Sequence, residues 1–169
     1  LRDCSLKPHK SAIMSYSSFR SRRNPTMFYE NSSCYILLVE DNPLDADLIR
    51  RALQKSDPGT RLDVARDGEE ALAFLKRWEE GAPAPIFILL DMKLPKVDGL
   101  EVLRAIKTNA RFKILPVVML TSSNEINDIR QAYALGANSY VVKAIDYNEF
   151  SQAVIRIRDY WCGLNVHPE

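Results

Sequence analysis

Short apolar runs recur between residues 34 and 161, and turn-forming or charged residues bound each one. The runs lie at about 35–39, 61–65, 86–90, 117–120 and 139–142. Runs of this length are typical of buried strands in a parallel sheet. Between them, apolar residues recur at helical spacing, which predicts helices at about 43–55, 69–79, 99–106, 125–135 and 147–161.

Five strand–helix units joined by short loops predict an α/β fold, because parallel strands need crossover helices that cover both faces of the sheet. We expect a doubly wound five-stranded parallel sheet of order 2-1-3-4-5, a flavodoxin-like arrangement. Helix-end signals support the helix ranges: Ser122, Ser123 or Asn124 precedes the fourth helix and Gly136 follows it. Asp146 and Glu149 have the spacing of a capping box at the start of the fifth.

Length and charge predict one domain with a tail at each end. The chain has 169 residues, of which 46% are hydrophobic and 27% charged, with a net charge of +1. Residues 1–33 are basic, polar and Ser-rich, so we expect a disordered extension, either natural or left by expression, before a domain at 34–162 and a tail at 163–169. The rest of the chain is mildly acidic, which argues against nucleic acid as a partner.

Targeting signals and cysteine usage indicate a cytoplasmic protein. No apolar run approaches the ~20 residues that span a bilayer, so no membrane contact is expected. Residues 1–33 lack the apolar core of a secretory signal. Cys4, Cys34 and Cys162 are an odd number without CxxC spacing, which favours a reducing compartment over a disulfide framework. Cys34 precedes a predicted strand and Cys162 follows a predicted helix, so we expect packing or surface positions for them instead of redox roles.

Carboxylate, hydroxyl and amino side chains directly follow four of the apolar runs. Glu40 and Asp41 come after the first run, Asp91 after the third, Thr121 after the fourth and Lys143 after the fifth. Because the carboxyl ends of parallel strands meet at one edge of the sheet, we expect these side chains to converge. Each alone is ordinary as a helix cap, loop residue or solvated strand end; their conjunction indicates a functional site.

Three clustered carboxylates repel one another, so a cation is their natural complement. Mg²⁺ prefers octahedral oxygen ligands, with few carboxylates, several waters and a phosphate oxygen. We assign Asp41 and Asp91 as direct ligands and Glu40 as a ligand through water, with the backbone carbonyl of Lys93 as a further ligand.

Asp91 stands alone at its strand end and is the candidate nucleophile, because a carboxylate can attack phosphorus to form an aspartyl-phosphate. Mg²⁺, Lys143 and the Thr121 hydroxyl can stabilise the added phosphoryl oxygens. Ser122 is a further candidate for the phosphoryl-binding group. Tyr140 alternates with Val141 along the predicted strand. Its ring either simply packs against neighbouring side chains or rotates near the site.

These residues together resemble the receiver domain of two-component response regulators, over roughly Cys34 to Trp161. The motifs that carry the resemblance are Leu38-Val39-Glu40-Asp41-Asn42, Leu89-Leu90-Asp91-Met92-Lys93-Leu94-Pro95, Asp98-Gly99, Leu120-Thr121-Ser122, Gly136-Ala137 and Lys143. The stretch at 107–111 and the aromatic end of the last helix are similar to single-domain regulators that partner phytochrome-type histidine kinases.

The resemblance implies a phosphoacceptor and not a conventional enzyme. Asp91 would accept a phosphoryl group from a sensor histidine kinase, which in the narrower group is a bacteriophytochrome. Thr121 and Tyr140 would couple phosphorylation to the surface of the fourth helix, fifth strand and fifth helix. The resemblance to the narrower group also implies a homodimer that forms through this surface. Tyr160 and Trp161 would then be either interface residues or residues at the edge of the core.

One residue departs from the family pattern. Ala144 stands where the family usually has proline after the lysine, commonly with a cis peptide bond. A cis bond without proline costs about 3 kcal/mol. Either the bond is trans and Lys143 is aimed differently, or surrounding contacts enforce the strain; we expect a rearranged loop that still permits phosphorylation.

Other functions fit less well. Haloacid-dehalogenase phosphatases need an acid two residues after the nucleophile, where this chain has Lys93. Glu40 and Asp41 would repel the phosphate of a flavin, and no glycine-rich nucleotide motif lies at a strand–helix junction. The remaining alternative is a dimeric interaction module with the receiver fold that works without phosphorylation.

Overall fold

A five-stranded parallel sheet forms the centre of the protein. The computed structural model describes residues 34–167. The strand order is β2-β1-β3-β4-β5, as predicted. The strands are β1 (Tyr35–Val39), β2 (Arg61–Ala65), β3 (Phe87–Leu90), β4 (Val117–Thr121) and β5 (Ser139–Val142). All four neighbouring pairs are parallel.

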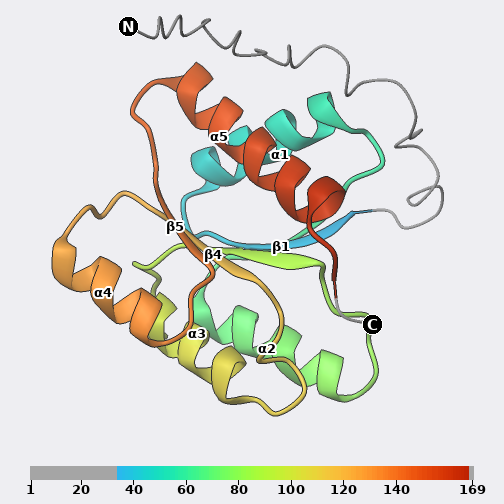
Figure 1. The fold of residues 1–169 in the computed structure, drawn as a ribbon, viewed down its shortest axis with the longest axis vertical. Helices are drawn as coiled ribbons and strands as arrows, with labels where there is room; N and C mark the ends of the chain where they lie inside the picture. The colour runs from blue at the N-terminus through green and yellow to red at the C-terminus, as the bar shows by residue number, and fades with distance from the viewer. Residues whose placement is uncertain (1–33, 168–169) are drawn as a thin grey trace, which may run out of the picture. The chain divides into compact units, whose positions relative to one another are not determined.

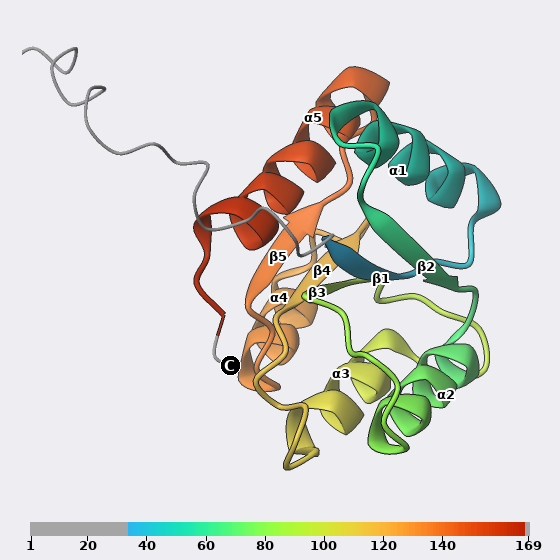
Figure 2. The same ribbon diagram turned by 90° about the vertical axis from the view of Figure 1, so that its right-hand side faces the viewer.

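Helices cover both faces of the sheet, α1 and α5 on one side and α2, α3 and α4 on the other (Figures 1 and 2). The helices are α1 (Pro43–Ser56), α2 (Gly68–Glu79), α3 (Gly99–Thr108), α4 (Ile126–Ala134) and α5 (Tyr147–Asp159). A π-helical turn, Tyr160–Leu164, continues directly from α5. The doubly wound fold that the alternating pattern predicted is therefore confirmed.

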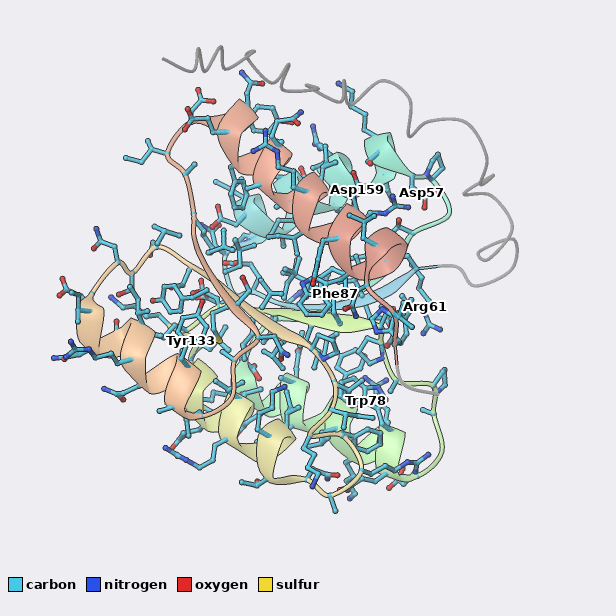
Figure 3. All side chains as sticks on the ribbon, in the orientation of Figure 1. Asp57, Arg61, Trp78, Phe87, Tyr133 and Asp159 are labelled. Atoms are coloured by element: carbon cyan, nitrogen blue, oxygen red, sulfur yellow. A yellow bond between two sulfur atoms is a disulfide. The ribbon has the colours of Figure 1, made fainter. Side chains whose placement is uncertain are left out.

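Alternate residues of each strand divide the core into two layers. In β1, Leu37 and Val39 pack with α2, α3 and α4, whereas Ile36 and Leu38 pack with α1 and α5. Successive side chains of a strand point to opposite faces, so a strand buried on both sides needs a continuous apolar run. Trp78 and Phe87, labelled in Figure 3, are fully buried in the two different layers.

The start of α4 differs from the sequence expectation, whereas its end agrees with it. Helix α4 begins at Ile126 and its N-cap residue, Glu125, makes no side-chain cap bond. The expectation that Ser122, Ser123 or Asn124 would be the cap residue is wrong, although Ser123 Oγ accepts from the Glu125 N–H at 3.4 Å and donates to the Asp128 side chain at 2.5 Å. The C-terminal signal is confirmed: Gly136 has φ +95°, which suits glycine just after a helix end.

A disulfide joins Cys34 to Cys162, so the expectation against a disulfide framework is wrong for this pair. Helix α5 follows β5, runs antiparallel to the strands and therefore returns to the edge where they begin. The end of α5 thus meets the start of β1, and the two Cα atoms lie 5.8 Å apart despite a sequence separation of 128. This distance is within the usual disulfide range.

The remaining predictions about chain organisation concern residues at the margins of the structure. Residues 1–33, with Cys4 and the predicted disorder, lie outside the described part. The proposed domain boundary after residue 162 falls inside the turn Tyr160–Leu164, and the boundaries stay predictions. Among residues 34–167, none of the helices has the length and apolar character required to cross a membrane.

Candidate functional site

The loop after β1 places two neighbouring acids in different environments. The Glu40 N–H donates to the carbonyl of Ala65 at 2.9 Å, so the chain stays against β2 for one residue beyond β1. Glu40 is 2% exposed, whereas Asp41 is exposed. Asn42 then caps α1 with its side chain, and its own N–H donates to Glu40 Oε1 at 3.2 Å. The immediate turn into α1 keeps both acids at the carboxyl edge of the sheet.

The carboxylate of Asp91 lies at the end of β3, beside this acid pair. Its N–H donates to the Val39 carbonyl at 3.0 Å, which ties the end of β3 to the end of β1. Its Oδ1 accepts from the N–H groups of Met92 at 2.6 Å and Lys93 at 3.4 Å. Asp91 is 7% exposed, so the carboxylate is both oriented and largely shielded from water.

A glycine allows α3 to start directly against the backbone of Asp91 and Met92. A Cβ on Gly99 would lie 2.1 Å from the Asp91 carbonyl oxygen and 2.8 Å from the Met92 Cα. The Gly99 N–H also donates to the Met92 carbonyl at 2.8 Å. Any larger residue would displace the backbone that carries Asp91, which explains the Asp98-Gly99 motif in physical terms.

Lys143 brings the end of β5 into the same group. Its N–H donates to the Thr121 carbonyl at 2.8 Å. Its Nζ donates to Glu40 Oε2 at 2.6 Å, Asp91 Oδ2 at 2.8 Å and Asp45 Oδ2 at 2.9 Å. No peptide bond among residues 34–167 is cis, so the bond from Lys143 to Ala144 is trans and the lysine still points into the acid group. Whether the loop is rearranged stays a prediction.

One ammonium group faces more negative charge than it can neutralise. Burial, together with the nearby charge of Asp91, raises the pKa of Glu40 to about 7 against the opposing effect of Lys143. Burial alone would lower the pKa of Lys143, but hydrogen bonds to Asp91, Glu40 and Asp45 raise it above its usual range. Lys143 therefore stays charged, and the cluster retains an excess of negative charge that would attract a divalent cation.

Three of the acids have the geometry of a metal-binding group. Ligand oxygens of Glu40, Asp41 and Asp91 all lie within 4.8 Å of one another. Carboxylate oxygens are hard donors that suit Mg²⁺, Mn²⁺ or Ca²⁺. The residues therefore fit a divalent ion, and the exposed Asp41 leaves the group open to solvent on one side.

The other switch candidates lie around Ser123. Thr121 is fully buried, and its Oγ1 accepts from the Ser123 N–H at 3.3 Å. The Tyr140 hydroxyl donates to the Ser123 carbonyl at 3.0 Å, and its ring packs partly buried against the core layer of α2–α4. Ser122 is exposed. The loop after β4 thus links Thr121 to Tyr140 through the backbone of Ser123.

The two aromatic residues after α5 lie in different surroundings. Tyr160 is 49% exposed. The Trp161 ring stacks on Phe87, with ring centroids 6.4 Å apart, and packs against the core layer of α1 and α5. Trp161 is therefore at the edge of the core, whereas Tyr160 is available to a partner.

Sequence reasoning missed two residues of this edge. Asp45 binds Lys143 from the first turn of α1. The sequence indicated Asp45 by its position five residues after Glu40. The first turn of the predicted helix at that position must lie at the same edge of the sheet as the end of the preceding strand. Ser123 was considered only as a helix cap, and its spacing of two residues from Thr121 carried no recognisable signal for a bridging role.

Comparison with known proteins identifies close relatives. Residues 36–155 match the family model described as the response regulator receiver domain. The chain is 43% identical over 134 residues to the probable methanogenesis regulatory protein FilR2 of Methanothrix harundinacea, covering 79% of this chain and 86% of that protein. It is 41% identical over 135 residues to the response regulator Rcp1 of Synechocystis sp., covering 79% of this chain and 92% of that protein.

Solved structures agree with the sequence relatives. The phosphorylated cyanobacterial phytochrome response regulator RcpA superposes with a TM-score of 0.77 at 38% identity, covering 82% of this chain and all of that one. The Mn²⁺-bound form of Rcp1 superposes with a TM-score of 0.74 at 39% identity, covering 80% of this chain and 99% of that one.

Proposed function

The chain belongs to the response regulator receiver domain family, and from this membership we propose that it receives a phosphoryl group on Asp91 from a sensor histidine kinase. Receiver domains of two-component signalling act as phosphoacceptors. The observation that carries the proposal is the 2.8 Å contact between Lys143 Nζ and Asp91 Oδ2, inside a group of acids suited to a divalent ion.

The proposed transfer needs little chemistry from the protein beyond orientation and charge. The Asp91 carboxylate attacks phosphorus of a phosphohistidine, the P–N bond breaks, and the imidazole leaves with its electron pair. Backbone N–H groups of Met92 and Lys93 hold one carboxylate oxygen in place. Lys143 already contacts the other oxygen and would stabilise charge on the added phosphoryl group, with the Thr121 hydroxyl as a second donor. Later hydrolysis of the acyl phosphate would return Asp91 to its starting state.

Mg²⁺ is the proposed cofactor. Asp41 and Asp91 would bind it directly, Glu40 through water, and the Lys93 carbonyl would complete the protein ligands. When bound, the ion would neutralise the excess negative charge of the acids and bind a phosphoryl oxygen. The Mn²⁺-bound form of Rcp1 supports a divalent ion in a related protein.

Phosphorylation would be transmitted through the loop after β4. Movement of Thr121 toward a new phosphoryl group would pull on Ser123, and through it on Tyr140. The proposed output surface comprises α4, β5 and α5, which carry large exposed apolar side chains. These are Ile126, Tyr133, Val142 and Tyr147, and Tyr160 adds a further exposed ring in the turn directly after α5.

The proposed partners follow from this surface and from the relatives. A second copy of the chain is the expected occupant of the output surface, giving a homodimer. The likeness to RcpA, whose description names a phytochrome response regulator, supports a phytochrome-type kinase as donor. A cytoplasmic location and the absence of nucleic-acid binding remain part of the same proposal.

Incubation with Mg²⁺ and acetyl phosphate tests phosphoryl acceptance at Asp91 without requiring the cognate kinase. We expect a base-labile phosphoryl adduct by mass spectrometry, lost in EDTA and in Asp91→Asn. Asp98→Asn, which changes an exposed acid seven residues away, is the matched control and should still be labelled. Labelling of Asp91→Asn would refute Asp91 as acceptor, and no labelling of the wild type by any donor would favour the phosphorylation-independent interaction module.

A further inference from the structure

The disulfide lies at the opposite edge of the sheet from the acid group. Cys34 directly precedes β1, whereas Glu40 directly follows it. Five strand residues at about 3.3 Å each separate the two ends by roughly 17 Å. Any role of the disulfide is therefore distinct from phosphoryl transfer at Asp91.

The cysteines connect the start of the domain to an aromatic turn. Cys162 lies in the π-helical turn Tyr160–Leu164, next to Trp161. The Trp161 ring stacks on Phe87, which Figure 3 shows beneath the C-terminal end of α5. Within the turn, the Asn165 N–H donates to the Tyr160 carbonyl at 2.8 Å. The disulfide is the covalent contact that fixes this turn to the sheet.

The two cysteine residues differ in their exposure to solvent. Cys34 is 5% exposed, whereas Cys162 is only partly buried. Thiol–disulfide exchange requires a thiolate to reach one sulfur in line with the bond. Attack at Cys162 is the open route, and Cys34 is then the leaving thiolate.

We propose that Cys34 and Cys162 form a reversible redox site whose oxidation state sets the order of the turn Tyr160–Leu164. In reduction, a dithiol protein or reagent attacks Cys162 Sγ, the S–S bond breaks, and Cys34 leaves and takes up a proton. The second thiol of the reductant then displaces Cys162, so the reductant becomes a disulfide and the domain holds two thiols. Glutathione disulfide reverses the reaction and yields two molecules of reduced glutathione.

This site gives the domain a second input at its C-terminal helix. The stacking of Trp161 on Phe87 does not depend on the disulfide, so reduction should loosen the turn locally without unfolding the domain. Tyr160, the exposed aromatic residue of the turn, is the part of the proposed output surface that this change reaches. The phosphoryl site, at the other end of β1, stays unchanged.

Thiol counting in the full chain tests the covalent part of the proposal. Cys4→Ser removes the third cysteine, and alkylation in denaturant then counts the remaining thiols at a series of glutathione ratios. We expect no free thiol at oxidising ratios and two at reducing ratios, with a peptide containing Cys34 linked to Cys162 in the oxidised form. Two free thiols at every ratio would overturn the proposal.

Hydrogen exchange of the same protein tests the structural part and needs no change at either cysteine of the pair. Reduction should accelerate exchange of the amides of residues 160–165 at least tenfold and leave those of 36–39 unchanged. Cys34→Ala with Cys162→Ala is the control and should show no response to reductant. Equal exchange in both redox forms of the Cys4→Ser protein would refute the proposed effect on the turn.

Labelling by acetyl phosphate separates this proposal from the one for Asp91. Oxidised and reduced protein should be labelled at the same rate, because the two sites lie at opposite edges of the sheet. A difference in rate would contradict the independence of the two sites. Failure of labelling in both forms would count against Asp91 alone, since the thiol count and the exchange rates do not depend on phosphorylation.

Discussion

Replacing Lys143 by methionine tests how the acid group is held together without metal. Methionine keeps an unbranched apolar stem but removes the ammonium group. The change deletes three contacts, of 2.6 Å to Glu40, 2.8 Å to Asp91 and 2.9 Å to Asp45. It leaves three carboxylates close together with no cationic partner among the described side chains that contact them.

The cost is large because the group is buried. The side chains of Lys143, Asp91 and Glu40 are 11%, 9% and 1% exposed. Removing one partner of a buried ion pair typically costs ~3–5 kcal/mol. Glu40, whose pKa is already raised to about 7, can take up a proton and relieve part of the repulsion. We therefore expect a loss near the lower limit, about 3 kcal/mol at neutral pH.

Urea unfolding followed by far-UV circular dichroism measures this loss. In EDTA, Lys143→Met should lose about 3 kcal/mol of unfolding free energy. Lys96→Met is the control, because Lys96 binds two acids, Asp67 and Glu69, through a side chain that is 53% exposed, although the side chain of Asp67 is only 11% exposed. An ion pair whose cation is exposed to water contributes at most ~1 kcal/mol. Mg²⁺ should restore more stability to Lys143→Met than to the wild type, since the ion replaces the missing positive charge.

The pH dependence gives a second check of the same reasoning. The folded-state pKa of Lys143 is raised, so its contribution is complete below the ordinary lysine pKa and disappears as pH rises through the raised value. At acid pH the carboxylates become protonated, and the difference between Lys143→Met and wild type should shrink. Equal losses for Lys143→Met and Lys96→Met in EDTA at neutral pH would refute the account of a charge-held cluster.

Three further changes test other parts of the domain. Gly99→Ala should lower the free energy of unfolding by ~1–3 kcal/mol and slow labelling by acetyl phosphate, because the new Cβ would lie 2.1 Å from a backbone oxygen. Gly163→Ala is its control and should change the free energy of unfolding by less than ~1 kcal/mol, because nothing lies within 4 Å of that Cβ. Burial and a hydrogen bond to Asp63 raise the pKa of Tyr35 from 10.0 to about 12, so wild type should lose more stability than Tyr35→Phe as pH rises through this window. Lys93→Asn should shorten the acyl phosphate lifetime after donor removal, because an amide can orient a water where the ammonium group would bind the phosphoryl oxygens.

Each of these changes has an outcome that would contradict it. Gly99→Ala as stable as Gly163→Ala would show that the backbone can move at little cost. Identical alkaline unfolding of Tyr35→Phe and wild type would remove Tyr35 as the titrating group. An unchanged or longer phosphoryl lifetime in Lys93→Asn would exclude the proposed effect of Lys93 on water attack.

The order of elements could be predicted from the sequence because burial leaves a direct trace in composition. A strand covered on both faces must be apolar throughout, as Ile36–Val39 and Phe87–Leu90 are, and a helix covering a sheet must repeat its apolar face every three to four residues. The parallel arrangement then requires Glu40, Asp91 and Lys143 to emerge at one edge. Their convergence needed no knowledge of distances.

Tertiary structure decided the contacts that sequence distance hides. Asp45 binds Lys143 across 98 positions because the first turn of α1 lies at the edge where the strands end. Cys34 meets Cys162 across 128 positions because α5 returns to the edge where the strands begin. Glu40 is buried while its neighbour Asp41 is exposed, and this difference depends on how the loop turns into α1. Patterns along the chain specify which surfaces are buried, but which side chains meet there depends on packing among elements far apart in sequence.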